Sequence, residues 1–176
     1  MKKIIIVMLI ATGIMIYGNK SSELIIPKEA IRFRVIANSD EKVDQDIKLL
    51  VRDELQTKIT SDLESSDGLA TSRKILSSNI DNYKQVVATT LENNNIQEPF
   101  SINYGLNYFP EKTYKGVKYQ EGNYESLVVT LGSGEGKNWW CVLFPPLCLL
   151  EAEEEEEVEE VEYKFFVQEL IDKYLK

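Results

Sequence analysis

The sequence predicts an α+β fold in which two or three helices pack against one side of a small, mostly antiparallel β-sheet. Two patterns predict this fold: apolar residues alternate with polar ones in some segments, as in half-buried strands, and recur with the helical period in others. These segments follow one another in the order β-α-α-β-β, and separate runs of strands and helices are typical of α+β structures. A chain of 176 residues that is 43% hydrophobic can bury the core of one such domain.

The first predicted strand begins at Ile31. Apolar side chains alternate there with Arg32 and Arg34 as far as Val35, which is the pattern of a half-buried strand. Residues 38–40, Asn-Ser-Asp, end the strand, and each of their side chains can accept a hydrogen bond from the free amides at the start of a helix. We therefore expect a helix directly after residue 40.

Two helices are predicted next. The first runs from about Glu41 to Asp62, and the second follows the turn-forming residues 65–68 and ends at residues 93–95, three asparagines. Each helix carries an apolar stripe that would face the core: Val43, Ile47, Leu50, Val51 and Leu55 in the first, and Leu76, Ile80, Tyr83, Val87 and Leu91 in the second.

Two further strands and a final helix complete the pattern. Residues 102–108 alternate, and the strand ends at Pro110, which cannot donate to a sheet ladder. Residues 124–131 form the third strand, in which Val128 indicates partial burial of the second face. Near the C-terminus one helical face is apolar, and docking of this helix on its own body is the default expectation; its members are Tyr163, Phe166, Val167, Leu170 and Tyr174.

The N-terminus has the layout of an export signal. Lys2 and Lys3 precede fourteen uncharged, mostly apolar residues, 4–17, a run shorter than the about 20 residues that span a bilayer comfortably. The two lysines predict that the body lies outside the cytoplasm. The organisation we expect is a signal peptide or a membrane anchor over residues 1–19, a linker over 20–30, the folded domain over 31–150, and an acidic segment with the amphipathic helix over 151–176.

Charge and composition exclude several functions. The formal net charge is −9, but residues 151–176 hold eleven acidic and three basic side chains, which leaves 18 acidic against 17 basic in the rest. A nearly neutral body offers no basic face to phosphates, so we expect no nucleic-acid partner. The chain has no histidine, which removes the commonest general base and the usual zinc ligand. We expect neither a metal nor a cofactor.

A glycine-rich loop precedes the last part of the body. Gly132, Gly134 and Gly136 lead into Lys137, but the spacing lacks the four residues between glycines and the Lys-Ser/Thr pair of a phosphate-binding loop. We expect these glycines to permit a tight or bulged backbone.

Residues 139–148 form the densest aromatic and apolar segment of the body. Neighbouring Trp139 and Trp140 point to different sides in any regular structure, so one can enter the core while the other lies at the surface. An exposed tryptophan beside Pro145 and Pro146 would make a binding hot spot, because it adds contact area while few torsions are ordered. The alternative is that the whole segment fills the core.

This segment contains the two cysteines of the chain. Cys141 and Cys148 can pair in a disulfide if the chain is exported, and buried free thiols are the alternative. A catalytic role for either would lack the histidine base that usually activates a cysteine.

Motifs in both halves of the body match one family in order. They are Arg34–Asp40, Asp44-Gln45, Lys48, Val51–Asp53, Tyr108–Pro110, Gly122 with Tyr124-Glu125, the glycines 132, 134 and 136 with Asn138, and Trp139–Cys148. From about Ile31 to Cys148 the chain resembles stage II sporulation protein R, and the tryptophan-cysteine-proline string is the most specific part of the match.

This resemblance implies a signalling protein of endospore formation and not an enzyme. Proteins of this kind are made in the forespore and exported to the space between the forespore and mother-cell membranes. There they activate the membrane-embedded aspartic protease that processes the sigma-E precursor. The contact residues we expect are Trp139, Trp140, Phe144 and Pro145, with Arg34, Asn38, Asp40 and Arg52 as polar candidates.

Other interpretations stay open at the level of sequence. Asp40 can instead cap the first helix, and Arg52 with Asp53 can be ordinary surface charges. A rival function is an extracytoplasmic hydrolase that uses Cys141 or the carboxylates Asp40, Asp44 and Asp53. A third is a lipid- or wall-associated structural protein held by an uncleaved anchor.

Overall fold

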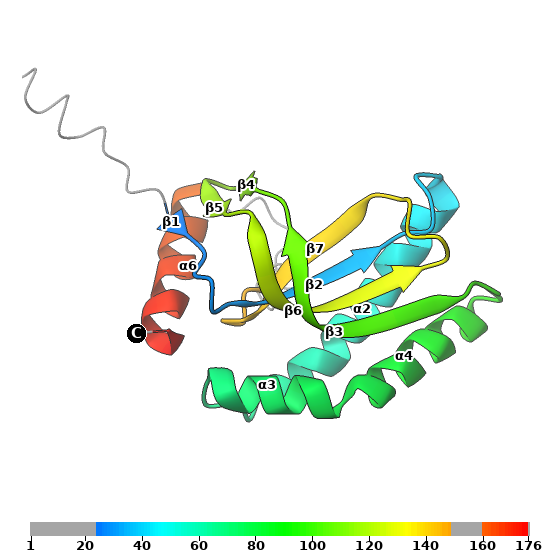
Figure 1. Cartoon of the computed structure of the whole chain (residues 1–176), viewed down its shortest axis with the longest axis horizontal. Coiled ribbons are helices and arrows are strands. Elements are labelled where there is room, and N and C mark those ends of the chain that lie inside the picture. The colour runs from blue at the N-terminus through cyan, green and yellow to red at the C-terminus, as the bar shows by residue number, and fades with distance from the viewer. Residues whose placement is uncertain (1–23, 149–159, 176) are drawn as a thin grey trace, which may run out of the picture.

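The computed structural model describes residues 24–148 and 160–175 and confirms the α+β class (Figure 1). The four-stranded main sheet has the order β3-β6-β2-β7, and a three-stranded second sheet has the order β1-β5-β4. The strands are β1 Leu24–Ile25, β2 Ile31–Ile36, β3 Phe100–Phe109, β4 Lys112–Tyr114, β5 Val117–Tyr119, β6 Gly122–Leu131 and β7 Asn138–Phe144. The helices are α2 Lys42–Leu63, α3 Leu69–Ser78, α4 Ile80–Asn93 and α6 Glu160–Tyr174.

The main sheet is mixed, with more antiparallel than parallel pairing. β2 runs parallel to β6 and antiparallel to β7, while β3 runs antiparallel to β6. The predicted order β-α-α-β-β with a final helix is therefore confirmed, and the tryptophan-cysteine segment adds the edge strand β7.

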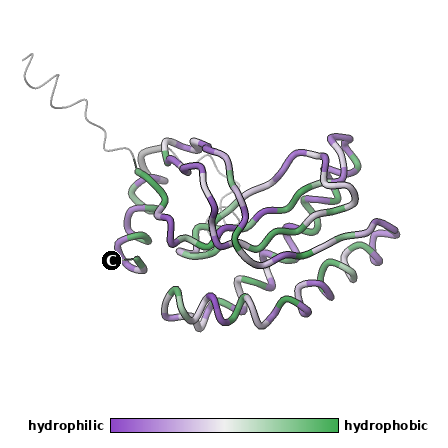
Figure 2. The backbone as a smooth tube through the Cα atoms, in the orientation of Figure 1, coloured by the Kyte–Doolittle hydropathy of each residue, from purple (hydrophilic) through white to green (hydrophobic). Residues whose placement is uncertain are grey.

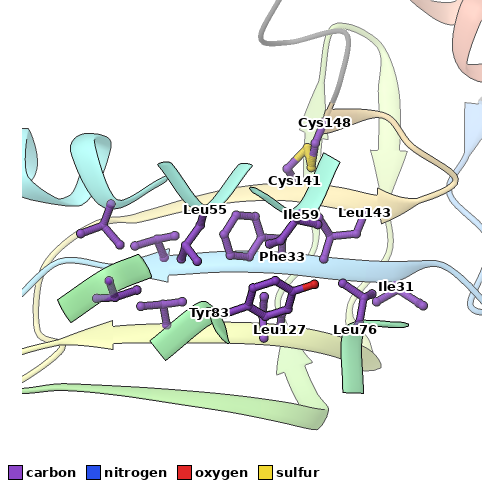
Figure 3. Close-up of a cluster of buried hydrophobic side chains, with 14 of the residues drawn as sticks. Ile31, Phe33, Leu55, Ile59, Leu76, Tyr83, Leu127, Cys141, Leu143 and Cys148 are labelled. Atoms are coloured by element: carbon purple, nitrogen blue, oxygen red, sulfur yellow. A yellow bond between two sulfur atoms is a disulfide. The ribbon is translucent and has the colours of Figure 1, made fainter. Parts of the chain in front are cut away.

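Helices α2, α3 and α4 lie on one side of the main sheet and enclose the larger core (Figures 1 and 3). Alternate residues of the strands belong to it, as with Ile31, Phe33 and Val35 of β2, and Figure 2 shows apolar stretches along both the strands and the helices. The fully buried members of this core include Phe33, Val51, Leu55, Leu76, Tyr83, Val87, Leu127 and Val129.

The second predicted helix is divided in two at Asn79. This residue has a non-helical backbone (φ −102°, ψ 9°), and its side-chain amide donates to the carbonyl of Ile75 over 2.9 Å. An asparagine competes in this way for backbone hydrogen bonds, which disfavours it inside a helix. The apolar stripe nevertheless continues across the break, since Leu76 and Tyr83 are both fully buried.

A smaller core lies on the other side of the main sheet. Helix α6 packs there on β1, β5 and the end of β7, and its buried members are Ile26, Ala30, Val117, Val142, Leu147, Tyr163, Val167 and Ile171. Docking of the C-terminal helix on its own body is thereby confirmed. From Leu24 onward the expected linker belongs to the fold, because β1 pairs with β5 and Ile26 and Ala30 are buried.

The two terminal features predicted from sequence lie mainly outside the described residues. These are the signal or anchor of residues 1–19 and most of the glutamate run of residues 151–162. Within residues 24–148 and 160–175, no helix has the length and apolarity needed to cross a bilayer.

Candidate functional site

Strand β7 places its two tryptophans on opposite faces of the main sheet. Trp139 contacts Phe33 edge-to-face on the helix side, with ring centroids 5.6 Å apart. Trp140 contacts Phe109 on the other side at 5.7 Å. Each tryptophan is half-buried, so both contribute to the surface as well as to packing. The sequence expectation that the pair divides between two sides is confirmed, because neighbouring residues of a strand alternate.

Trp139 and Arg52 form a first candidate surface at the edge of the helical layer. The Arg52 guanidinium lies 5.3 Å from the Trp139 ring centroid, in the geometry of a cation–π contact. Arg52 also donates through Nε to the Asp53 carboxylate over 2.6 Å. Arg52 and Asp53, which the sequence also allowed as ordinary surface charges, form an ion pair, and Arg52 is in addition in contact with a tryptophan.

Trp140 lies at a pocket on the opposite face, which we call the Arg32 pocket. Its volume is about 300 Å³, and its lining includes Arg32, Phe109, Lys112, Tyr119, Asn138 and Trp140. Lys112 and Asn138 are exposed at its rim, whereas Arg32 is only 2% exposed. The Lys112 ammonium lies 5.3 Å from the Trp140 ring centroid.

Arg32 is buried among aromatic rings. Its guanidinium carbon lies 3.6 Å from the ring centroid of Tyr124, 5.0 Å from that of Phe109 and 5.6 Å from that of Tyr119. Burial lowers the pKa of Arg32, and the neighbouring tyrosines act in the other direction. An arginine still stays protonated at neutral pH, so this is a buried positive charge held by ring faces.

Several hydrogen-bond donors at this face lack an acceptor. The Nε atoms of Arg32 and Arg34 and the indole Nε1 of Trp140 are buried and unpartnered. Arg32 makes one long bond, from Nη2 to the Gln120 carbonyl over 3.4 Å. Arg34, opposite Trp140 in the β2–β7 register, lies over Phe109 at 4.8 Å. Buried donors are normally satisfied, so unpartnered ones mark a candidate binding site.

Asn38 and Asp40 serve the architecture of the glycine loop. The Asn38 side chain accepts from the Ser133 amide over 2.9 Å and donates to Asp44 over 2.9 Å. Asp40 accepts from the Lys137 amide over 2.7 Å. The expected helix cap at Asp40 is therefore wrong: no side chain caps α2, and the Asp40 carboxylate instead holds the loop before β7.

Phe144 and Pro145 lie in the interior. Phe144 is 3% exposed and contacts Tyr174 edge-to-face at 5.5 Å, and Pro145 is buried beside it. Burial removes both from the partner surface expected from the sequence, because α6 covers this end of β7. Cys141 and Cys148 are joined in a disulfide with Cα atoms 5.6 Å apart, and both are buried (Figure 3).

The carboxylates proposed for hydrolysis do not form an acid–base pair. Asp40 holds the Lys137 amide, Asp44 accepts from Asn38 and Ser39, and Asp53 accepts from Arg52. Asp53 follows Asp44 by nine positions in the same helix, a rise of about 13.5 Å along the helix axis. Within the described part of the chain, no group of three or more acidic or cysteine side chains could hold a metal ion.

Six of the pocket residues were not identified from the sequence as site residues: Arg32, Phe109, Lys112, Tyr114, Tyr119 and Asn138. Arg32 has the sequence position of a solvent-side residue in a half-buried strand, and only the second sheet and the Phe109 and Tyr124 rings bury it. The alternation of arginine with apolar residues along β2 was the one feature of the local sequence that could have pointed to Arg32 as a site residue.

Comparison with known proteins assigns the family. The family model for stage II sporulation protein R matches residues 27–154. The stage II sporulation protein R of Bacillus subtilis (strain 168) is 36% identical over 146 residues, which cover 83% of this chain and 65% of that protein. No solved structure matches the chain. The sequence motifs, the fold and these matches agree, and the chain belongs to the stage II sporulation protein R family.

Proposed function

We propose that this protein is an extracytoplasmic signal of endospore formation that activates the membrane-embedded aspartic protease processing the sigma-E precursor. In this proposal the chain crosses the forespore membrane by means of its apolar leader. It then acts from the space between the forespore and mother-cell membranes, either released or still anchored. It contributes binding energy and no bond chemistry of its own.

Membership of a sporulation family supports the biological setting. The disulfide between Cys141 and Cys148 supports an oxidising location, since such bonds persist outside the cytoplasm and are rare within it. The carboxylate of Asp40 already accepts a hydrogen bond, and the two cysteines are joined in a disulfide. These groups therefore provide no free nucleophile beside a base, which favours a recognition function over hydrolysis.

The Arg32 pocket is the observation that carries the proposal. It combines a half-buried tryptophan and a buried arginine with a lysine at the rim, and tryptophan and arginine are among the residue types that dominate the energy of protein interfaces. An activator must bind one state of its target more tightly than the other, since equal affinity shifts no equilibrium. A pocket with unmatched donors can provide this difference if only the active state presents the matching group.

The test is activation of the protease by the purified protein. The full-length chain, kept in mild detergent, is added to membranes that carry the protease and its precursor substrate, and cleavage is followed over time. We expect cleavage that saturates with added protein. A rate that stays constant at all concentrations would reject the proposal.

Two variants make this test specific. Trp140→Ala should raise the half-activating concentration by about 30-fold, as expected when a hot-spot residue worth about 2 kcal/mol is lost. Phe165→Ala is the matched control, because Phe165 is an aromatic residue 73% exposed on α6 and away from the pocket lining. A hydrolase would instead lose nearly all activity in Asp44→Asn.

A further inference from the structure

We propose that the Arg32 pocket receives a carboxylate of the protein partner, carried by an aspartate or glutamate side chain next to apolar residues. This inference rests on the proposed function and adds the chemistry of the segment that the partner presents. The pocket residues that act are Arg32, Lys112 and Trp140, with Phe109 and Tyr119 as apolar walls.

The polarity of the pocket specifies an acceptor. The two unpartnered polar atoms of its side chains, Arg32 Nε and Trp140 Nε1, are both N–H donors. Lys112 adds an ammonium group at the rim. No aspartate or glutamate is among the described residues that line the pocket. A ligand that brought a second donor would leave all these groups unsatisfied, whereas a carboxylate offers two acceptor oxygens.

The charge of Arg32 specifies an anion. Its side chain is 98% removed from solvent, and no described carboxylate lies within ion-pair distance of its guanidinium. Cation–π contacts with Tyr124 and Phe109 offset part of the desolvation cost. An arginine edge presents parallel N–H groups that fit a carboxylate, and a charge-assisted bond of this kind is about twice as strong as a neutral one.

The apolar walls and the small volume of the pocket favour a ligand that is a partner's acidic side chain with apolar residues next to it. Rings of Phe109, Tyr119 and Trp140 surround the donors, and about 300 Å³ lies at the small end of ligand-site volumes. A bare anion would leave these rings in water, while a protein segment can cover them and place its carboxylate between them. The pocket also includes Asn138 and Trp140 of β7, the outermost strand of the main sheet, whose far edge pairs with no described strand.

The binding test uses synthetic peptides that tile the extracytoplasmic part of the candidate protease. Each acidic peptide is paired with a copy in which its aspartates and glutamates are replaced by asparagine and glutamine. The readout is the indole N–H resonance of Trp140 in the full-length chain, assigned from its loss in Trp140→Phe. The second signal recorded is the indole N–H of Trp139, a residue that also lines the pocket but whose ring packs on Phe33 at the other face of the sheet.

We expect one acidic peptide to move the Trp140 indole signal downfield and its amide copy to leave it unchanged. Lys112→Glu should weaken the binding of that peptide at least tenfold. Lys74→Glu makes the same change of charge on exposed helix α3 and should stay within twofold of the natural protein. Equal binding of acidic and amide peptides, or a response of Trp139 alone, would overturn the proposal.

Two further outcomes separate this proposal from the function on which it rests. If the acidic peptide binds but the protein never activates the protease, the pocket stands and the proposed function fails. If the protease is activated equally by Lys112→Glu, Trp140→Phe and the natural protein, the function stands and the pocket proposal fails. Peptide binding seen only after the glutamates of residues 151–159 are changed to glutamine would assign the pocket to this chain's own acidic segment and overturn the partner assignment.

Discussion

Gly136 has no room for a side chain, because a Cβ atom there would overlap the carbonyl oxygen of Ser39 and lie 2.9 Å from the Ala37 Cβ. The loop before β7 passes this close to the end of β2 because its amides bond to that turn. The Gly136 amide donates to the Ala37 carbonyl over 2.9 Å, and the Lys137 amide donates to Asp40 over 2.7 Å. At Gly136 the glycine pattern therefore has a structural cause, the close approach of the loop to the end of β2.

Gly136→Ala should lower the free energy of unfolding by about 2–3 kcal/mol, because the loop must move and lose these hydrogen bonds. Gly105→Ala is the matched control: its Cβ would meet its nearest neighbour at 3.7 Å, in ordinary contact. Alanine in a strand interior should leave stability unchanged or raise it by up to about 1 kcal/mol. Urea denaturation of both variants measures the difference, and equal stability would contradict the close approach described here.

Glu98 is a second residue whose environment has a measurable consequence. Its Oε2 atom is buried without a partner. Burial first, and the nearby Asp44 carboxylate second, raise the pKa of Glu98 above its ordinary value. The folded protein therefore holds this proton more tightly than the unfolded chain. Its contribution to stability is greatest below the ordinary pKa of glutamate and declines as the pH rises through the raised pKa.

Glu98→Gln should be more stable than the natural protein at pH 7 and should lack this decline, because an amide carries no charge. The measurement is the free energy of unfolding between pH 4 and pH 8, compared with Glu92→Gln, a change at an exposed position near the end of α4. If the curves of Glu98→Gln and the natural protein run parallel, the assignment of the pKa shift is wrong.

Among the secondary-structure elements, strand β7 is the one that connects the main sheet with both hydrophobic cores. It pairs with β2, sends Cys141 and Leu143 into the larger core, and sends Val142 into the smaller one. After the strand, the disulfide returns Cys148 to Cys141, and the Cys148 carbonyl accepts a hydrogen bond from Gln56 of α2 over 2.5 Å. The disulfide thus fastens the end of this edge strand to the helical layer.

Replacement of both cysteines by alanine should lower the free energy of unfolding by about 2–3 kcal/mol, the chain-entropy value for a loop of this size. The sequence separation of the two cysteines is 7. A reducing agent serves as the control, since it should lower the stability of the natural protein to a similar degree and leave the double variant unchanged. A double variant as stable as the oxidised natural protein would show that the bond adds nothing to the fold.

At the scale of the whole molecule, one sheet separates two cores of unequal size. The larger core lies under α2, α3 and α4, and the smaller one lies under α6 and the second sheet (Figure 1). Regions with fewer buried apolar contacts open at lower free energy. We therefore expect α6 to exchange its amide hydrogens faster than α2.

Val167→Asp should release α6 without unfolding the main core, because it places a charge at a fully buried position of the smaller core. Amide exchange across residues 160–174 should become at least tenfold faster, while amides near Val51 stay protected. Phe165→Asp, at a position 73% exposed on the same helix, is the control and should change neither rate. Loss of protection in both cores together would instead show that they form one cooperative unit.

Local patterns were sufficient for most of the fold. Period-two alternation identified β2, β3 and β6, and helical stripes identified α2, α4 and α6, because such periods follow from one face of each element being buried. The assignment of Val43 and Leu50 to the core face of α2 was wrong: they are 66% and 42% exposed, and the buried apolar face is formed by Ile47, Val51, Leu55 and Ile59. β7 was not predicted as a strand: it is apolar on both faces, so its residues do not alternate. The break at Asn79 was also missed, since the apolar stripe continues across it.

The family, the α+β class and the opposite orientation of Trp139 and Trp140 could be predicted from the sequence, because motifs and side-chain alternation are properties of neighbouring residues. Which of the candidate residues share a surface depends on how distant elements pack, and local patterns could not predict it. Phe144 lies in the interior because α6, which is distant in the chain, covers it. Arg32 lies at the centre of a pocket because the rings of Phe109, Tyr119 and Tyr124, also distant in the chain, cover it. Whether a residue is buried depends on the segments that pack on it. A local sequence period contains no information about segments that are distant in the chain.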